Sequence, residues 1–244
     1  AIRQAMRLMP GPLVAIPLQD QQQEPVCRAD QLIKACSSSI NTLVVDGPTH
    51  YGGLATTVRI DDNRCRVTHA GVLAGEALQR LGQLVVLLVC TGNTCRSPMA
   101  EVLLKAKFQQ RFPKLKDMEF PPVFIGSAGL SAFPGGPASP EAINVMKQRG
   151  LSLLDHQSRA LTERTLRNAD LVLAMTASHR AAIVDRFPDL ASRVHLVSGG
   201  NKDVSDPFGG SESVYIECAT QIDEYLDHWI NQIEESWFAA WEID

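Results

Sequence analysis

The sequence predicts an α/β fold: a four-stranded parallel sheet flanked by helices on both faces, preceded by a smaller β-rich segment. From about residue 83 onward, apolar runs alternate with amphipathic stretches, which is the pattern of parallel strands joined by crossover helices. Before that point, short runs rich in Val, Ile and Thr are separated by Gly and Pro. We therefore expect two domains, residues 1–83 and residues 84–244.

Each predicted element of the second domain follows from a local signal. Four apolar runs predict strands at 83–89, 122–129, 169–175 and 193–197. Ser97 as N-cap and Pro98 at the first helical position predict a helix over 97–112, and Ser139 and Gly150 bound a second one. Further helices are expected at 162–168, 177–187 and about 212–235. The last carries an apolar stripe formed by Tyr215, Ile216, Ala219, Ile222, Leu226, Trp229, Ile230 and Ile233.

The first domain gives weaker signals. The runs GPLVAIPL (11–18), NTLVVDGP (41–48), LATTVRI (54–60) and RCRVTHAGVL (64–73) suit strands. A short helix is expected over 28–37, and the Gln-rich stretch 19–25 is expected to be a loop.

Composition excludes several classes of protein. Apolar residues make up 45% and charged residues 20% of the chain, as in ordinary globular proteins, and the net charge of −4 is too small to indicate nucleic acid or an anionic membrane as partner. No apolar run is long enough to span a membrane. The six cysteines are scattered and show no C-x-x-C zinc spacing, so we expect no metal, no cofactor and reduced thiols in a cytoplasm.

The stretch VCTGNTCRSPMAE (89–101) carries the chemistry. It lies between a buried strand and a helix start, where free backbone amides and the helix dipole together attract anions. Gly92 lets the backbone approach closely, and the planar guanidinium of Arg96 can hold two phosphate oxygens. The loop therefore predicts a phosphate cradle with Cys90 at its base. In that electropositive field we expect Cys90 to be a thiolate that attacks phosphorus.

Such a reaction needs an acid to protonate the leaving group and a base to activate water. Asp206, in DPFGG (206–210), follows the fourth strand and should face the same end of the sheet. Cys95 fits a buried small residue, although its nearness to Cys90 allows a reversible disulfide. His156, His179 and His195 show no partner pattern, which favours surface or structural roles.

These residues resemble the low-molecular-weight protein-tyrosine phosphatase family. The resemblance rests on Cys90 to Glu101, on Ser127-Ala-Gly129 and on the DPFGG stretch, and it covers residues 84 to about 235. It implies a phosphatase I-like fold, no cofactor and a phosphorylated protein as substrate. It makes Cys90 the nucleophile, Arg96 the phosphate ligand and Asp206 the general acid, with Ser127 supporting the loop. The remaining residues expected to bind substrate or shape the loop are Thr91, Gly92, Asn93, Thr94, Cys95, Ser97 and Phe208.

Within that family, Thr94, the two glycines after Phe208 and the stretch 161–179 resemble the bacterial protein-arginine phosphatases. The glycines provide no aromatic wall for a phenol ring, and a guanidinium leaving group suits the carboxylate of Asp206. Phosphoarginine is therefore the favoured substrate, and phosphotyrosine is the alternative. Two other functions stay open: arsenate reduction, which would use Cys95 or Cys218 as shuttle thiols, and a redox or phosphate-binding module without turnover.

Residues 1–83 carry a second likeness. RLMPGPLVAIPL (7–18) and GLATTVRI with CRVTHAGVL (53–73) resemble the later half of the YrdC-like domain of threonylcarbamoyl-AMP synthases. Residues 1–6, which precede the first match, do not contain the basic nucleotide-binding half of that domain. We therefore expect a partial or degenerate domain without synthase activity.

Overall fold

The computed structural model describes residues 18–20, 22, 24–36, 52–61, 64–115, 121–233 and 240–242. By its contacts the chain divides into two compact units. One consists of residues 79–239, and the other combines residues 1–78 with 240–244. Among the described residues, no helix is both long and apolar enough to cross a membrane.

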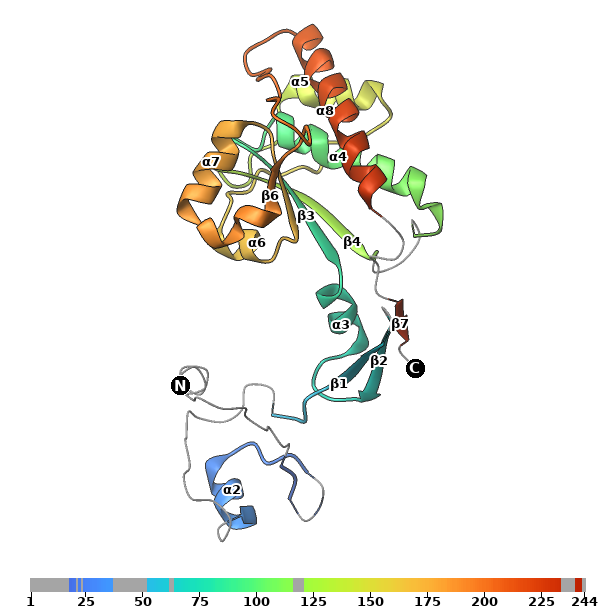
Figure 1. The fold of residues 1–244 in the computed structure, drawn as a ribbon, viewed down its shortest axis with the longest axis vertical. Helices are drawn as coiled ribbons and strands as arrows, with labels where there is room; N and C mark the ends of the chain where they lie inside the picture. The colour runs from blue at the N-terminus through green and yellow to red at the C-terminus, as the bar shows by residue number, and fades with distance from the viewer. Residues whose placement is uncertain are drawn as a thin grey trace. The chain divides into compact units, whose positions relative to one another are not determined.

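The larger unit is built on a parallel sheet with strand order β4-β3-β5-β6 (Figure 1). The predicted four-stranded parallel sheet is thereby confirmed. The strands are β3 (Leu84–Cys90), β4 (Val123–Gly129), β5 (Leu171–Ala174) and β6 (Val194–Leu196). Each of them lies within two residues of the range that the sequence predicts for it.

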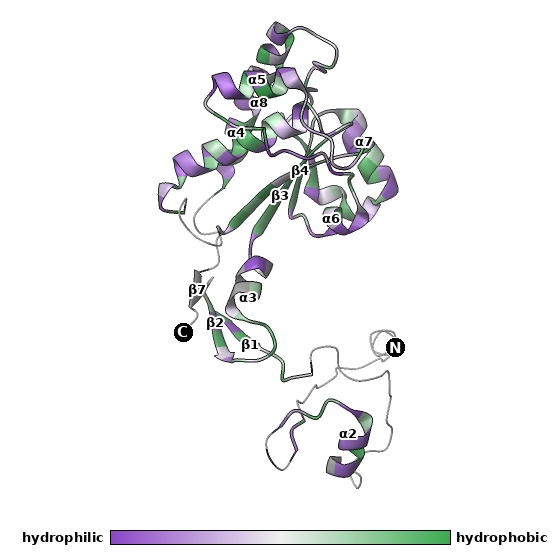
Figure 2. Cartoon of the chain, turned by 180° about the vertical axis from the view of Figure 1, so that it is seen from behind, coloured by the Kyte–Doolittle hydropathy of each residue, from purple (hydrophilic) through white to green (hydrophobic). Residues whose placement is uncertain are grey.

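Helices cover both faces of this sheet (Figure 1). Alternate residues of β3 enter two separate cores: Val86 and Leu88 pack in one, while Leu87 and Val89 pack in the other. Figure 2 shows β3 and β4 as predominantly hydrophobic, as expected for strands buried on both faces. The first core also contains residues of α4 (Arg96–Arg111), α5 (Pro140–Gln148) and α8 (Glu212–Gln232). The second contains residues of α6 (Glu163–Arg167), α7 (Ala177–Arg186) and the 3-10 helix η2 (Pro188–Arg193).

Helix α4 begins differently from the sequence prediction. Its N-cap is Cys95 and its first residue is Arg96, so Ser97 is not the cap and Pro98 is the third helical residue. The prediction is wrong because the Ser97 hydroxyl contacts the Cys90 sulfur and accepts from Asn93 instead of capping the helix. Proline is tolerated there, since the first-turn amides have no partner within the helix. After Phe112, η1 (Pro113–Leu115) follows.

The remaining helix signals hold in part. The Ser139 hydroxyl accepts from the Ala142 amide at 3.3 Å and caps α5 as predicted. Along α8, the predicted apolar stripe is buried except for Ile216, which is 40% exposed. The indole N–H of Trp229 donates to the Val197 carbonyl at 2.8 Å and fastens α8 to the chain just after β6.

The smaller unit contains α2 (Ala29–Cys36) and a three-stranded sheet. Strand β1 (Thr57–Asp61) pairs antiparallel with β2 (Arg64–His69), and β2 pairs in parallel with β7 (Ala240–Glu242), a strand that the sequence did not predict. Helix α3 (Gly75–Leu81) spans the border between the units. The predicted strand runs 11–17 and 41–48 lie outside the described residues, and a domain boundary after residue 83 stays a prediction.

Candidate active site

Cys90 is the last residue of β3, and the loop 91–95 leads from it directly into α4. This places the loop at the carboxyl end of the sheet, where open α/β folds bind ligands. The Cys90 sulfur is buried. The backbone N–H of Asn93 donates to it at 3.2 Å, and the Ser97 hydroxyl lies 3.0 Å away. The sulfur therefore sits at the base of the loop, with two hydrogen-bonding groups beside it.

Asn93 holds the loop in shape. Its φ of 55° lies in the left-handed region, which asparagine tolerates better than most residues, and its side chain is fully buried. Its side-chain nitrogen Nδ2 donates to the hydroxyls of Ser97 and Ser127, each at 2.9 Å. Its amide oxygen accepts from the backbone N–H of Arg159 at 2.8 Å. Asn93 and Ser127 therefore support the loop from behind, and the Asn93 side chain is not free to bind substrate.

A second group of contacts supports this network, and of its members only His156 was not indicated by a sequence pattern. The His156 ring nitrogen Nε2 lies 2.8 Å from the Asn93 carbonyl oxygen, and the Ser127 hydroxyl donates to the Glu101 carboxylate at 2.6 Å. Gly129 ends β4 against the loop: a Cβ there would lie 2.5 Å from the Thr91 carbonyl oxygen. The loop therefore rests on backbone that leaves no room for a larger side chain.

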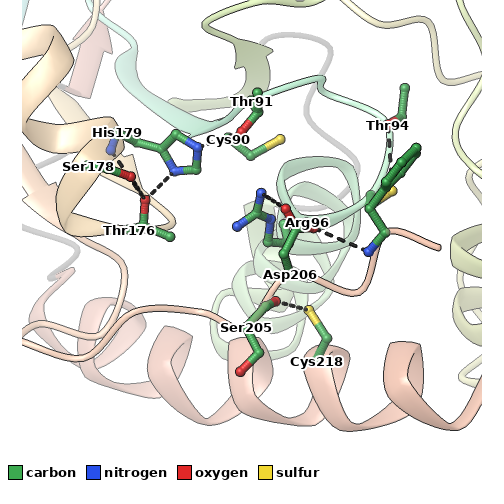
Figure 3. Close-up of polar contacts among 12 residues, drawn as sticks. Cys90, Thr91, Thr94, Arg96, Thr176, Ser178, His179, Ser205, Asp206 and Cys218 are labelled. Atoms are coloured by element: carbon green, nitrogen blue, oxygen red, sulfur yellow. Dashed lines mark hydrogen bonds and ion pairs between the residues drawn. The ribbon is translucent and has the colours of Figure 1, made fainter. Parts of the chain in front are cut away.

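Arg96 and Asp206 meet beside the loop (Figure 3). The guanidinium donates to the carboxylate over 2.7 Å from Nη2 to Oδ2. Arg96 is buried, whereas the Asp206 side chain is 54% exposed. The other Asp206 oxygen accepts from the Phe208 amide at 3.2 Å, which shapes the turn, and the Phe208 side chain itself is 80% exposed. The two side chains that the sequence placed on separate loops are thus in direct contact.

His179 contacts the loop from the opposite side, at the start of α7 (Figure 3). Its Nε2 lies 2.8 Å from the Thr91 hydroxyl, and its Nδ1 lies 2.8 Å from the hydroxyl of Thr176, the N-cap of α7. Burial lowers the pKa of His179, and the positive charge of Arg96 lowers it further. His156 and His179 therefore have partners in the loop that no sequence pattern indicated, whereas His195 contacts the nearby Ser192 carbonyl.

The cysteines near the loop differ in their surroundings. The Cys95 sulfur lies 3.3 Å from the Tyr215 hydroxyl inside the core, so its side chain is buried, and a substrate contact at Cys95 stays a prediction. Burial, followed by the hydrogen bond with Cys95, raises the pKa of Tyr215 to about 12. Cys90, Cys95 and Cys218 are free thiols. Thr94 is half-buried, with its hydroxyl 3.6 Å from the Cys95 sulfur.

A cysteine at the base of the loop, an arginine at its end and a facing aspartate form the arrangement that the sequence predicts for a phosphate-binding site with a nucleophile. Within the described ranges, His, Cys, Asp and Glu side chains form no cluster that could hold a metal ion. The model of the low molecular weight phosphotyrosine protein phosphatase family matches residues 85–237, and the chain belongs to that family.

Relatives in this family include two named arginine phosphatases. The chain is 38% identical over 154 residues to the protein-arginine-phosphatase of Bacillus subtilis, covering 62% of this chain and 97% of that protein. It is 35% identical over 146 residues to the low molecular weight protein-tyrosine-phosphatase Wzb of Salmonella typhi, covering 59% and 90%. Among solved structures, the arginine phosphatase YwlE of Geobacillus stearothermophilus matches with a TM-score of 0.54 and 36% identity over 61% of this chain and 92% of that one.

Proposed function

We propose that the chain is a cysteine-dependent protein phosphatase that hydrolyses phosphoarginine through a cysteinyl-phosphate intermediate. One observation carries the proposal: the Cys90 sulfur at the base of the loop, with Arg96 and Asp206 in contact 2.7 Å apart beside it. The family membership of residues 85–237 supports it. A mutant of a related YwlE arginine phosphatase, with serine in place of a cysteine, was solved with its active-site serine phosphorylated, which supports covalent transfer to this position.

In the first step the phosphoryl group enters the loop, and Arg96 exchanges the Asp206 carboxylate for phosphate oxygens. The Cys90 thiolate attacks phosphorus from below; the S–P bond forms as the P–N bond to the substrate guanidinium breaks. Asp206, released from Arg96 and carrying a proton taken from solvent, gives this proton to the leaving nitrogen, so the arginine side chain departs as a guanidinium. Its half-exposed position beside Arg96 suits this role, because the carboxyl can turn toward substrate.

In the second step water hydrolyses the cysteinyl phosphate. The Asp206 carboxylate takes a proton from the water as the water oxygen bonds to phosphorus. The S–P bond breaks at the same time, which releases phosphate and the Cys90 thiolate. The backbone N–H of Asn93 donates a hydrogen bond to the sulfur, and the Ser97 hydroxyl lies beside it. Both groups stabilise the negative charge that the sulfur carries as it leaves. The buried surroundings of Cys90 make these interactions stronger than they would be in water.

Phosphoarginine is favoured over phosphotyrosine for two reasons. Arginine phosphatases are among the relatives, at 38% and 37% identity. Thr94 leaves a small polar side chain at the loop, and the turn after Phe208 consists of glycines. Phosphotyrosine stays the second candidate, since the side chain of Phe208, on the turn bonded to Asp206, is 80% exposed and available to a phenol ring.

The test compares kcat/KM on the same protein carrying phosphoarginine or phosphotyrosine, for the wild type and for Asp206→Asn. We expect a clear preference for phosphoarginine and a fall of about 10²-fold or more in the variant on either substrate. A marked preference for phosphotyrosine would reject the arginine assignment. Absence of turnover on both, and on p-nitrophenyl phosphate, would reject the phosphatase itself.

Arsenate reduction is a weaker candidate. It would need a second thiol that can reach Cys90 and ionise readily. Cys218 is buried, donates to the Ser205 carbonyl at 3.5 Å, and burial raises its pKa to about 12. Cys95 has its sulfur against Tyr215 in the core. Both thiols suit structural roles better than a shuttle.

We further propose that residues 1–83 form a partial YrdC-like domain without synthase activity, and that the enzyme acts in the cytoplasm, where its nucleophile stays reduced. The free thiols of Cys65 and Cys90 agree with a reducing compartment. Tight ATP binding by the full chain, measured by calorimetry with Cys90→Ser to prevent hydrolysis, would contradict the first proposal.

A further inference from the structure

The residues just before Asp206 are held by groups from three elements. The Asp203 carboxylate accepts from the Ala177 amide at the start of α7 at 2.7 Å. The Val204 amide donates to the Met175 carbonyl, just after β5, at 2.8 Å, and the Val204 side chain is buried. These contacts fix residues 203 and 204 against the sheet, so the position of Asp206 depends on what holds Ser205.

Helix α8 holds Ser205 through two side chains. The Ser205 amide donates to the side-chain oxygen of Gln221 at 3.1 Å. The Ser205 carbonyl accepts from the Cys218 thiol at 3.5 Å (Figure 3). The side-chain nitrogen of Gln221 also donates to the Asp203 carbonyl at 3.3 Å, and to the Tyr225 hydroxyl at 3.2 Å. Gln221 therefore bridges residues 203 and 205 on the side that faces α8.

We propose that Gln221 is a positioning residue for Asp206 during proton transfer, an inference that rests on the proposed phosphatase function. Asp206 has to leave Arg96 and present its proton to the leaving atom, and small errors in such geometry are costly. Because the backbone of Asp203 and of Ser205 both bond to the side-chain amide of Gln221, the backbone that leads into Asp206 is held in one orientation. Without Gln221, the Ser205 amide loses its acceptor and the turn gains freedom. Phosphate binding by the loop and Arg96 is unaffected.

The experiment uses leaving groups that need the proton to different degrees. The full chain and Gln221→Leu are assayed on p-nitrophenyl phosphate, whose leaving group is stable as an anion, and on phenyl phosphate, whose leaving group requires protonation. We expect kcat/KM to fall about tenfold on phenyl phosphate and less than about threefold on p-nitrophenyl phosphate, since general acid catalysis supplies roughly 10²–10⁴-fold. The inhibition constant of inorganic phosphate should stay unchanged. The matched control is Gln232→Leu, at an exposed end of the same helix.

Two further variants separate positioning from stability. Gln221→Glu keeps an acceptor for the Ser205 amide but loses the donor to the Asp203 carbonyl, so its phenyl phosphate activity should fall only part of the way while its p-nitrophenyl phosphate activity stays near that of the wild type; this variant carries the test if the leucine variant does not fold. In an Asp206→Asn background, Gln221→Leu should have almost no further effect, because the acid it positions is gone. Equal losses on both substrates, or additive losses in the double variant, would overturn the inference. An Asp206→Asn variant whose kcat/KM depends on the leaving group no more than that of the wild type would refute instead the role proposed for Asp206.

Discussion

Replacing Asn93 with alanine removes the side chain that connects the phosphate loop to its support. The variant loses the bonds to the hydroxyls of Ser97 and Ser127 and the bond from the Arg159 amide, at 2.8–2.9 Å. All three hydrogen bonds involve the Asn93 side chain, which has no solvent exposure. It also leaves an alanine at a φ of 55°, which asparagine and glycine accept more readily.

The expected cost follows from these contacts. Three buried hydrogen bonds contribute about 0.5–1.5 kcal/mol each, and the left-handed backbone adds roughly 1 kcal/mol for alanine. Asn93→Ala should therefore lower the free energy of unfolding by about 2.5–5.5 kcal/mol. Asn93→Gly loses the same bonds without the backbone strain and should be more stable than the alanine variant by roughly 1 kcal/mol. Both variants should lose about 10²-fold in kcat/KM, because the loop amides no longer converge.

Urea unfolding followed by tryptophan fluorescence, together with p-nitrophenyl phosphate kinetics, measures both effects. Asn144→Ala, at an exposed position of α5, is the matched control and should change stability by less than about 0.5 kcal/mol. If Asn93→Ala behaved like this control, or proved more stable than Asn93→Gly, the supporting role of the network would be refuted.

Two further predictions concern the walls of the loop. Gly129→Ala places a methyl group 2.5 Å from the Thr91 carbonyl oxygen and should lower kcat/KM about 10²-fold. The control Gly200→Ala places a methyl group with nothing within 4 Å and should leave kcat/KM unchanged. Equal effects of the two substitutions would contradict the packing argument. Burial and the charge of Arg96 hold the pKa of His179 in the folded protein below its usual 6.5. As the pH falls below 6.5, His179 therefore binds a proton in the unfolded chain before it does so in the folded protein, and the free energy of unfolding decreases. Thermal unfolding between about pH 7 and pH 5 should therefore show a steeper loss for the wild type than for His179→Asn, and identical slopes would contradict the assignment.

The strands and the chemistry of the site follow from short-range signals. Apolar runs predict the sheet, and the spacing from Cys90 to Arg96 between a strand and a helix predicts the cradle. Asp206 could be placed because parallel strands end at one edge of a sheet. Each of these inferences needs only local sequence and the general geometry of an α/β fold.

The supporting contacts could not be predicted in this way. His156 and His179 lie 63 and 88 residues along the chain from the loop residues that they contact, and their approach depends on how the intervening segments pack. Helix α4 starts one residue earlier than predicted because the Ser97 hydroxyl contacts the Cys90 sulfur rather than capping the helix. Strand β7 pairs with β2 from the far end of the chain, and no local pattern encodes that pairing.

The most direct test asks where the phosphoryl group goes. Cys90→Ser is incubated with a phosphoarginine-bearing protein, and the stretch containing β3 and the loop is analysed by mass spectrometry. Because a serine phosphate ester resists the hydrolysis that frees cysteine, we predict one phosphoryl group retained on the side chain at position 90, and none when Arg96→Ala is introduced as well. A Cys90→Ser variant that still turns over substrate, or that carries the phosphoryl group elsewhere, would contradict the account.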